Sequence, residues 1–290
     1  MRDNPVSVSL HSSLAKRAQM MAHVPPFRPV AMKLMKLLHN SSASLTEIVA
    51  LLRSDAVLTG EVLQMANSPL FATRCEIRNV FQALAFLGTE RINALIITIA
   101  VRGLVDGRGG PFTHSCWRHN LATALICQRL STILHLPPER YYVAGLIHDI
   151  GRLALVNVFP EYGEAIALAE LSGDELLAAE RELFEIDHAE AGRWLLSQWG
   201  CPIELQNVAA WHESPPKTGT CDASLISLVR AASQLADVMK MSVFPCAPRW
   251  DLAEIVRGLP DLAREEVLAG FPKIADWVVT ELNGIEVSLW

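Results

Sequence analysis

A histidine and an aspartate, His148 and Asp149, stand side by side in a largely apolar stretch of this chain, residues 144–155. Burying an imidazole and a carboxylate in such surroundings is costly unless partners satisfy them. Both side chains are also typical ligands of a divalent metal ion. The pair therefore predicts a buried metal site, provided that the chain supplies further ligands elsewhere.

Three more histidines and one more aspartate, between residues 119 and 237, are suited to complete this site. Each lies in or at the end of a predicted helix, and a helical bundle can direct ligands from several helices to one centre. Taken singly, each has a simpler explanation, such as a core histidine or a solvated aspartate, so only the ordered set favours a metal site. The expected metal ligands are His119, His148, Asp149, His188, His212 and Asp237.

On a regular helix, His148 and Asp149 point about 100° apart, so they can converge only near a helix end, where Gly151 follows. Arg152 lies three residues after Asp149, on the same helix face, where it can orient the carboxylate or bind a phosphate. We therefore expect Asp149 and Arg152 to be the catalytic residues if the protein is an enzyme.

Asp187 and Glu190 have the spacing of a helix N-cap, which places His188 in the first turn of a helix. The positive end of the helix dipole disfavours a charged imidazolium. The position therefore predicts a neutral His188, the form that binds metal.

Apolar residues recur at helical spacing along most of the chain, and no segment is convincing as a strand. The β-branched run 96–99 has a local strand pattern, but the length of its segment favours a buried helix. The fold class expected is all-α. The expected helices are 30–38, 44–52, 55–66, 80–87, 90–105, 114–134, 139–150, 160–171, 173–184, 187–199, 202–212, 222–241, 251–259 and 262–282.

The segment 106–111 contains three glycines and a proline and is the best linker in the sequence. It predicts a boundary between an N-terminal helical lobe, residues 1–108, and a second helical domain with a C-terminal extension, residues 109–290.

Composition excludes several functions. A net charge of −6 is poorly suited to binding a polyanion, so we expect no nucleic-acid partner. The six cysteines form no C-x-x-C pair, which suits a reducing cytoplasm and signals neither a zinc knuckle nor a disulfide framework. The N-terminus lacks the pattern of a secretory signal, and the longest apolar run is about half of a membrane span. We therefore expect a cytoplasmic protein without a membrane segment.

The ordered ligand set resembles the HD superfamily of metal-dependent phosphohydrolases, and the chain from about Val24 to Lys240 is similar to the HDOD domain of bacterial signalling proteins. The stretches that carry this resemblance are 24–29, 54–58 with 64–71, 85–91, 117–119 with 144–152, 180–192, 199–202 and 211–213. The resemblance implies an all-helical fold, an N-terminal lobe packed on an HD-like lobe, and a role in bacterial signal transduction.

The HD-GYP phosphodiesterases of cyclic dinucleotides resemble this chain only in part. They have a lysine in place of Arg152 and a pair of histidines in place of Trp211-His212. Their glycine-tyrosine-proline loop is replaced here by residues 213–217. Hydrolysis of cyclic dinucleotides is therefore not expected.

Two functions remain open. One is a regulatory module that engages a signalling protein partner, with an HD-type metal centre that is either intact or vestigial. The other is a metal-dependent phosphohydrolase that acts on a phosphate ester or cyclic nucleotide, since the full ligand set survives. The cofactor expected is one or more divalent metal ions, iron or manganese among them, unless the centre has lost its ion. A phosphate-containing small molecule is the expected ligand.

Overall fold

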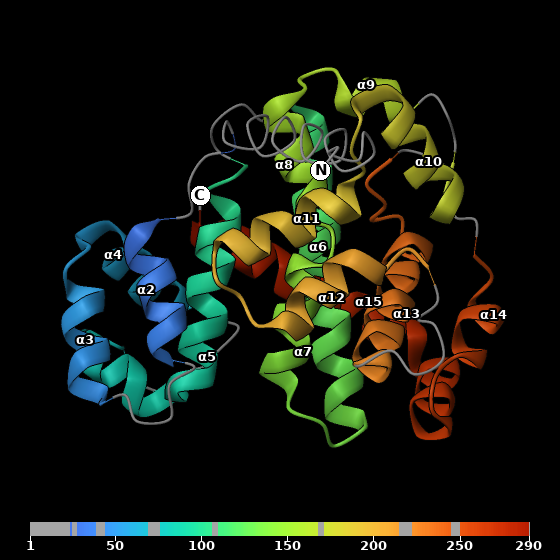
Figure 1. Ribbon diagram of the computed structural model, residues 1–290. Helices are drawn as coiled ribbons and strands as arrows, with labels where there is room; N and C mark the ends of the chain where they lie inside the picture. Colours follow the sequence, from blue (N-terminus) through green and yellow to red (C-terminus); the bar gives the residue numbers. More distant parts are fainter. Residues whose placement is uncertain are drawn as a thin grey trace, which may run out of the picture.

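The computed structural model describes residues 24, 28–38, 44–68, 76–105, 110–167, 171–214, 222–244 and 250–289. Every regular element in these ranges is a helix, which confirms the all-α class (Figure 1). The helices are α2 (Pro29–Leu38), α3 (Leu45–Arg53), α4 (Ala56–Ala66), α5 (Val80–Arg102), α6 (Pro111–Ile133), α7 (Pro138–Ile147), α8 (Ile150–Val158), α9 (Tyr162–Ala167), α10 (Gly173–Phe184), α11 (His188–Gln198), α12 (Ile203–Trp211), α13 (Ala223–Val238), α14 (Leu252–Arg257) and α15 (Asp261–Leu289).

Helices α2 to α5 form the N-terminal lobe, and local capping explains where two of them begin. Ser44 and Glu47 form a capping box at the start of α3. Asp55 caps α4 by accepting a hydrogen bond from the backbone N–H of Leu58. These polar side chains fix the helix starts, while the buried faces of α2, α3 and α4 pack against one another or against α5.

Helix α5 connects the N-terminal lobe with the rest of the molecule. The expected break occurs at Gly88, whose φ of 79° and ψ of 169° kink the helix. Beyond the kink, the β-branched run is helical and buried, as expected. The α5 helix packs on α7, and the two helices are joined by a 3.0 Å hydrogen bond between the hydroxyls of Thr98 and Tyr142.

Helix α5 is also the one described helix that is long and apolar enough to cross a membrane. Its most apolar window is 67% buried inside the protein, and its kink interrupts the apolar face. Burial of this extent is typical of a core helix.

The second lobe is centred on α6 and α7, which pack closely together, with α13 against both. A second layer is formed by α8, α11 and α12. The expected helix 139–150 ends earlier, at Ile147, because His148 and Asp149 form a turn between α7 and α8. Of the expected linker 106–111, residues 106–109 lie outside the described residues, Gly110 is the N-cap of α6 and Pro111 is its first residue. The boundary at residue 108 remains a prediction.

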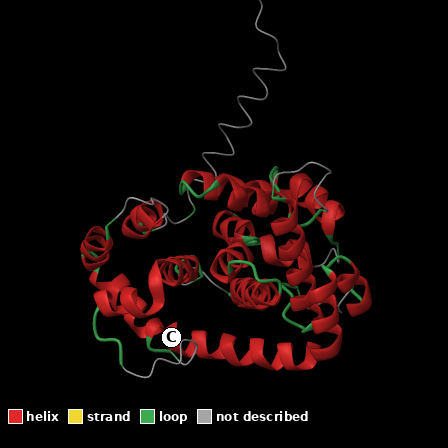
Figure 2. Cartoon of the chain, turned by 90° about the horizontal axis from the view of Figure 1, so that it is seen from below, coloured by secondary structure: helices red, strands yellow, loops and turns green. Residues whose placement is uncertain are grey.

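Helix α15 is longer than the expected segment 262–282, and it continues to Leu289 because its apolar face stays buried as far as Ile285. It packs on α6 of the second lobe and on α4 of the N-terminal lobe. Figure 2 shows it as one long helix along the edge of the molecule. Near its end, Glu286 pairs with Arg118 and the carbonyl of Leu289 accepts from Arg102.

Candidate metal centre

His148 and Asp149 form the short turn that separates α7 from α8. His148 keeps helical backbone angles, whereas Asp149, at φ −110° and ψ 22°, departs from them. Both side chains are buried, with 1% and 2% of their surface exposed. The pair does lie at a helix end, but Gly151 belongs to the next helix rather than to the stop of the first.

Gly151 allows α8 to pack directly against the first turn of α11. A Cβ at this position would lie 1.8 Å from the carbonyl oxygen of His188. Gly192 faces the same crossing, since its Cβ would lie 3.2 Å from the backbone nitrogen of Gly151. Because His188 is the first residue of α11, this close crossing determines where its imidazole lies relative to Asp149.

The turn contains His148, and three more histidines lie around it. In each of the four, the Nδ1 atom faces an oxygen. The pairs are His148 with the carbonyl of Gly145 at 2.7 Å, His119 with that of Met241 at 2.9 Å, His212 with that of Ala209 at 3.0 Å, and His188 with the carboxylate of Glu180 at 2.7 Å. An imidazole that donates from Nδ1 presents Nε2 to a metal, and this arrangement is typical of metal-binding histidines.

The buried side chains form two groups that share Asp149. One group is His119, His148 and Asp149, and the other is Asp149, His188 and His212; within each, one ligand atom per residue lies within 4.8 Å of the others. Nε2 of His148 and Oδ1 of Asp149 are buried without a hydrogen-bond partner. Because buried polar atoms are normally satisfied, these residues fit a divalent cation.

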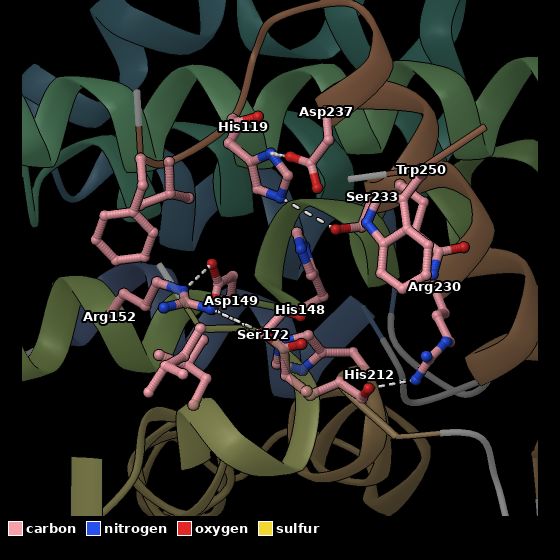
Figure 3. Close-up of a pocket in the computed structure, with 18 residues that line it drawn as sticks. His119, His148, Asp149, Arg152, Ser172, His212, Arg230, Ser233, Asp237 and Trp250 are labelled. Atoms are coloured by element: carbon pink, nitrogen blue, oxygen red, sulfur yellow. Dashed lines mark hydrogen bonds and ion pairs between the residues drawn. The ribbon is translucent and has the colours of Figure 1, made fainter. Parts of the chain in front are cut away.

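Asp237 belongs to neither group. Its Oδ1 lies 3.6 Å from Nδ1 of His119, while Nε2 of His119 lies 3.1 Å from the hydroxyl of Ser233. Five of the six expected ligands therefore come together, and Asp237 lies behind the imidazole of His119, at the wall of an adjoining cavity (Figure 3).

Arg152 is buried, and the structure favours its orienting role over phosphate binding. Its Nε donates to Asp149 at 2.5 Å and its Nη2 to Glu213 at 2.8 Å, while Nη1 lies 3.5 Å from Glu180. The guanidinium also lies over the ring of Phe244, 5.4 Å from its centroid. Its donors are thus directed at carboxylates of the protein, where they hold Asp149 in place.

Two acidic residues of the centre, Glu180 and Glu213, are absent from the expected set. Glu213 lies 3.4 Å from Nε2 of His188 and directly follows His212, so sequence adjacency was a usable signal. Glu180 is fully buried and also accepts a 2.5 Å hydrogen bond from the hydroxyl of Tyr162. No spacing rule indicates Glu180, because it lies on α10, a helix rich in acidic residues, and meets His188 only through the fold.

Asp149 and His148 have opposite electrostatic surroundings. Burial is the largest influence on the Asp149 carboxyl and raises its pKa, but Arg152 and His188 outweigh burial and hold the pKa well below its ordinary value. Burial, followed by the neighbouring His212, lowers the pKa of His148 well below its ordinary value. The pair is therefore an anionic carboxylate beside a neutral imidazole, the forms that bind metal.

His188 differs from the expected neutral form. Burial and then Arg152 lower its pKa, but the carboxylates of Glu180 and Asp149 outweigh both and raise it to about 10. The two carboxylates therefore affect the pKa of His188 more than the helix dipole does, and without an ion His188 is protonated. Its Nε2 lies 3.3 Å from Nε2 of His212 and can donate that proton to it. Metal binding at this group requires loss of the proton.

A cavity of about 320 Å³ opens beside the histidines (Figure 3). One wall carries His119, His148, Asp149 and His212, and the opposite walls come from α10, α13 and the segment before α14. These opposite walls include Arg230, Asp237, Phe244 and Trp250.

An all-helical fold in which a buried histidine–aspartate pair meets histidines from neighbouring helices defines the HD-related class of proteins. Within this class, residues 24–215 match the HDOD domain, which covers more than half of the sequence. The chain belongs to the HDOD family.

Solved structures share the fold over nearly the whole chain. A protein of Shewanella amazonensis, provisionally named a phosphohydrolase, is 25% identical, with a TM-score of 0.69 over 94% of this chain and 98% of its own. An HDOD protein of unknown function from Geobacter sulfurreducens is 22% identical, with a TM-score of 0.73 over 93% and 98%. An uncharacterized protein of Treponema pallidum is 20% identical over 79% of this chain, which spans only 46% of that relative.

Proposed function

We propose that this chain is an HDOD signalling module that binds divalent metal ions at the His148–Asp149 centre and regulates a partner protein. The observation that carries the metal site is that each of four imidazoles has its Nδ1 atom beside an oxygen, while Nε2 of His148 and Oδ1 of Asp149 are buried without a hydrogen-bond partner. A divalent cation bound there would lower the pKa of a coordinated water. The regulatory role is supported by the engagement of Arg152 with carboxylates of the protein.

The N-terminal lobe offers candidate surface for the partner. Val57 on α4 and Phe81 and Phe86 on α5 are 62%, 61% and 66% exposed. Large apolar side chains are enriched where proteins associate. In this proposal the partner is a signalling protein that contacts this lobe, while the second lobe holds the metal.

A metal-dependent phosphohydrolase is the second candidate function. The cavity beside the histidines favours it, because a ligand there would lie directly against the ligand set. The provisional name of the Shewanella protein supports the same activity. In this case Asp149 and the histidines would hold the metal, and Arg152 would position Asp149.

Metal analysis of the purified protein tests the metal centre, which both candidate functions require. We expect the wild type to retain iron or manganese and the His148→Ala variant to lose it. His114→Ala is the matched control, because His114 is an exposed histidine of α6 outside the cavity lining. A wild type that binds no divalent ion under any loading condition would overturn the metal centre.

Activity is then tested on the loaded protein with phosphate monoesters and cyclic nucleotides. Turnover that depends on added manganese or iron and disappears in Asp149→Ala would establish the hydrolase. Metal binding without turnover is the outcome expected for the regulatory module.

A further inference from the structure

Arg230 is a second guanidinium on the cavity wall, and in the described part of the chain no carboxylate lies within ion-pair distance of it. Its Nη1 donates to the backbone carbonyl of Glu213. Its side chain is partly buried and lies across the histidines from Arg152 (Figure 3). A partly buried guanidinium with donors to spare is suited to bind a carboxylate or phosphate in a forked geometry.

Trp250 lines the same side of the cavity, and its indole has no ring contact with any residue that the structure describes. Phe244, by contrast, contacts the ring of Phe112 at 5.5 Å between centroids and the guanidinium of Arg152. Among the described residues that line the cavity, Trp250 is therefore the aromatic side chain without a ring or guanidinium contact. The face of its indole can stack on a planar ring of a ligand.

The net charge of the side chains that line the cavity determines whether an anion can bind there. Three carboxylates line it, those of Asp149, Glu213 and Asp237, against two guanidiniums, those of Arg152 and Arg230. The sum without the imidazoles is −1, so an anion is disfavoured until a divalent cation adds positive charge. Binding of the anion and of the metal should therefore strengthen each other.

We propose that this cavity binds a phosphate ester that carries a planar ring, with the phosphate at Arg230 and the ring on Trp250. The cavity volume of about 320 Å³ is near the lower end of ligand pockets, about 300–1,000 Å³, and suits a single nucleotide better than a dinucleotide. The proposal rests on the metal centre proposed above, which supplies the charge that the three carboxylates require. In this proposal Arg230 and Trp250 select the ligand by binding its phosphate and its ring, whereas Arg152 does not contact it.

Calorimetric titration of the manganese-loaded protein with adenosine monophosphate tests the proposal. Arg230→Gln should weaken binding of adenosine monophosphate and of ribose 5-phosphate about tenfold or more, and Arg230→Lys should lose less because it keeps the charge. Trp250→Leu should weaken adenosine monophosphate about tenfold and leave ribose 5-phosphate unchanged. Arg91→Gln is the control, since Arg91 forms an exposed ion pair with Glu139 outside the cavity lining.

Metal content is measured on the same samples, so that the two proposals fail separately. Loaded wild-type protein that binds metal but neither phosphate ester overturns the ligand site and leaves the metal centre standing. Equal affinities of the wild type and a folded Arg230→Gln variant also overturn it. Wild-type protein that takes up no metal but still binds adenosine monophosphate in an Arg230-dependent way overturns the metal centre and the metal dependence of the ligand, and leaves Arg230 as the residue that binds the phosphate.

Discussion

Glu180 acts on the metal centre through His188. Its carboxylate accepts hydrogen bonds from both the backbone N–H and Nδ1 of His188, at 2.8 and 2.7 Å. The same carboxylate accepts from Tyr162. This arrangement fixes the ring orientation and increases the basicity of Nε2, as carboxylates behind metal-binding histidines do.

Replacing Glu180 by glutamine should lower metal affinity by roughly 10–100-fold, because the amide holds the imidazole less firmly and carries no charge. Competition of the protein with a chelator of known affinity measures the change. Glu182→Gln serves as the control, because Glu182 is an exposed carboxylate on the same helix. Equal affinities of the two variants would show that Glu180 does not position His188.

Arg152 compensates the buried carboxylates, together with the protonated His188, when no ion is bound. Arg152→Met should lower the free energy of unfolding of the metal-free protein by about 3–5 kcal/mol, because it leaves buried charges unpaired. Urea denaturation measures this loss. Arg91→Met, which breaks an exposed pair, should cost about 1 kcal/mol or less. A similarly small cost for Arg152→Met would contradict the compensating role.

At the level of the helices, the close packing of α8 against α11 sets the position of the proposed metal ligand His188. Gly151→Ala should destabilise the protein by about 3 kcal/mol or more, because the added methyl group meets the backbone carbonyl of His188. It should also weaken metal binding, since His188 moves with α11. Thermal melting and metal titration measure the two effects.

The matched variant is Gly60→Ala in α4, where an added Cβ meets nothing within 4 Å. It should be neutral or stabilising by about 0.5–1 kcal/mol, because alanine is the better helix former. If both alanine variants melt and bind metal alike, the crossing does not set the position of His188.

The contact between α5 and α7 has a pH signature. Burial raises the pKa of Tyr142 to about 12, although the hydrogen bond to Thr98 lowers it. The raised pKa means that this stabilisation is complete below the unfolded value near 10 and is lost as the pH rises through 12.

Tyr142→Phe should therefore be less stable than the wild type by about 1 kcal/mol at pH 7, because it lacks the hydrogen bond between the hydroxyls of Tyr142 and Thr98. By pH 11 the difference should shrink by about 1 kcal/mol, because only the wild type has a tyrosine at this position that ionises on unfolding. Urea denaturation at both pH values checks this. A difference that does not change with pH would contradict the burial of the hydroxyl.

The helices themselves were largely predictable, because short-range rules determine them. Capping by Asp187 indicated where α11 begins, and the gap between the expected helices 80–87 and 90–105 coincides with the kink at Gly88. A helix end near Gly151 was expected, but α8, which begins at Ile150 directly after the turn at Asp149, was not, since the expected helices left residues 151–159 unassigned.

The site was predictable to the extent that its residues have distinctive types. Histidines are rare enough that an ordered set stands out, whereas Glu180 resembles the exposed acids around it. Spacing indicated that Arg152 could orient Asp149, but it gave no sign that Glu213 also pairs with Arg152 and it assigned no role to Arg230. Sequence alone therefore indicates ligands better than it indicates the residues that orient them.

For the molecule as a whole, the position of α15 affects how the protein is made. Its contacts join partners far apart along the chain: Glu286 and Arg118 are separated by 168 residues, and Leu289 and Arg102 by 187. During synthesis at about 5–20 residues per second, α6 emerges roughly 10–40 s before the end of α15. For that time the apolar surfaces of α4 and α6 that α15 covers are exposed. The nascent chain is thus open to chaperones, and to aggregation, until α15 leaves the ribosome.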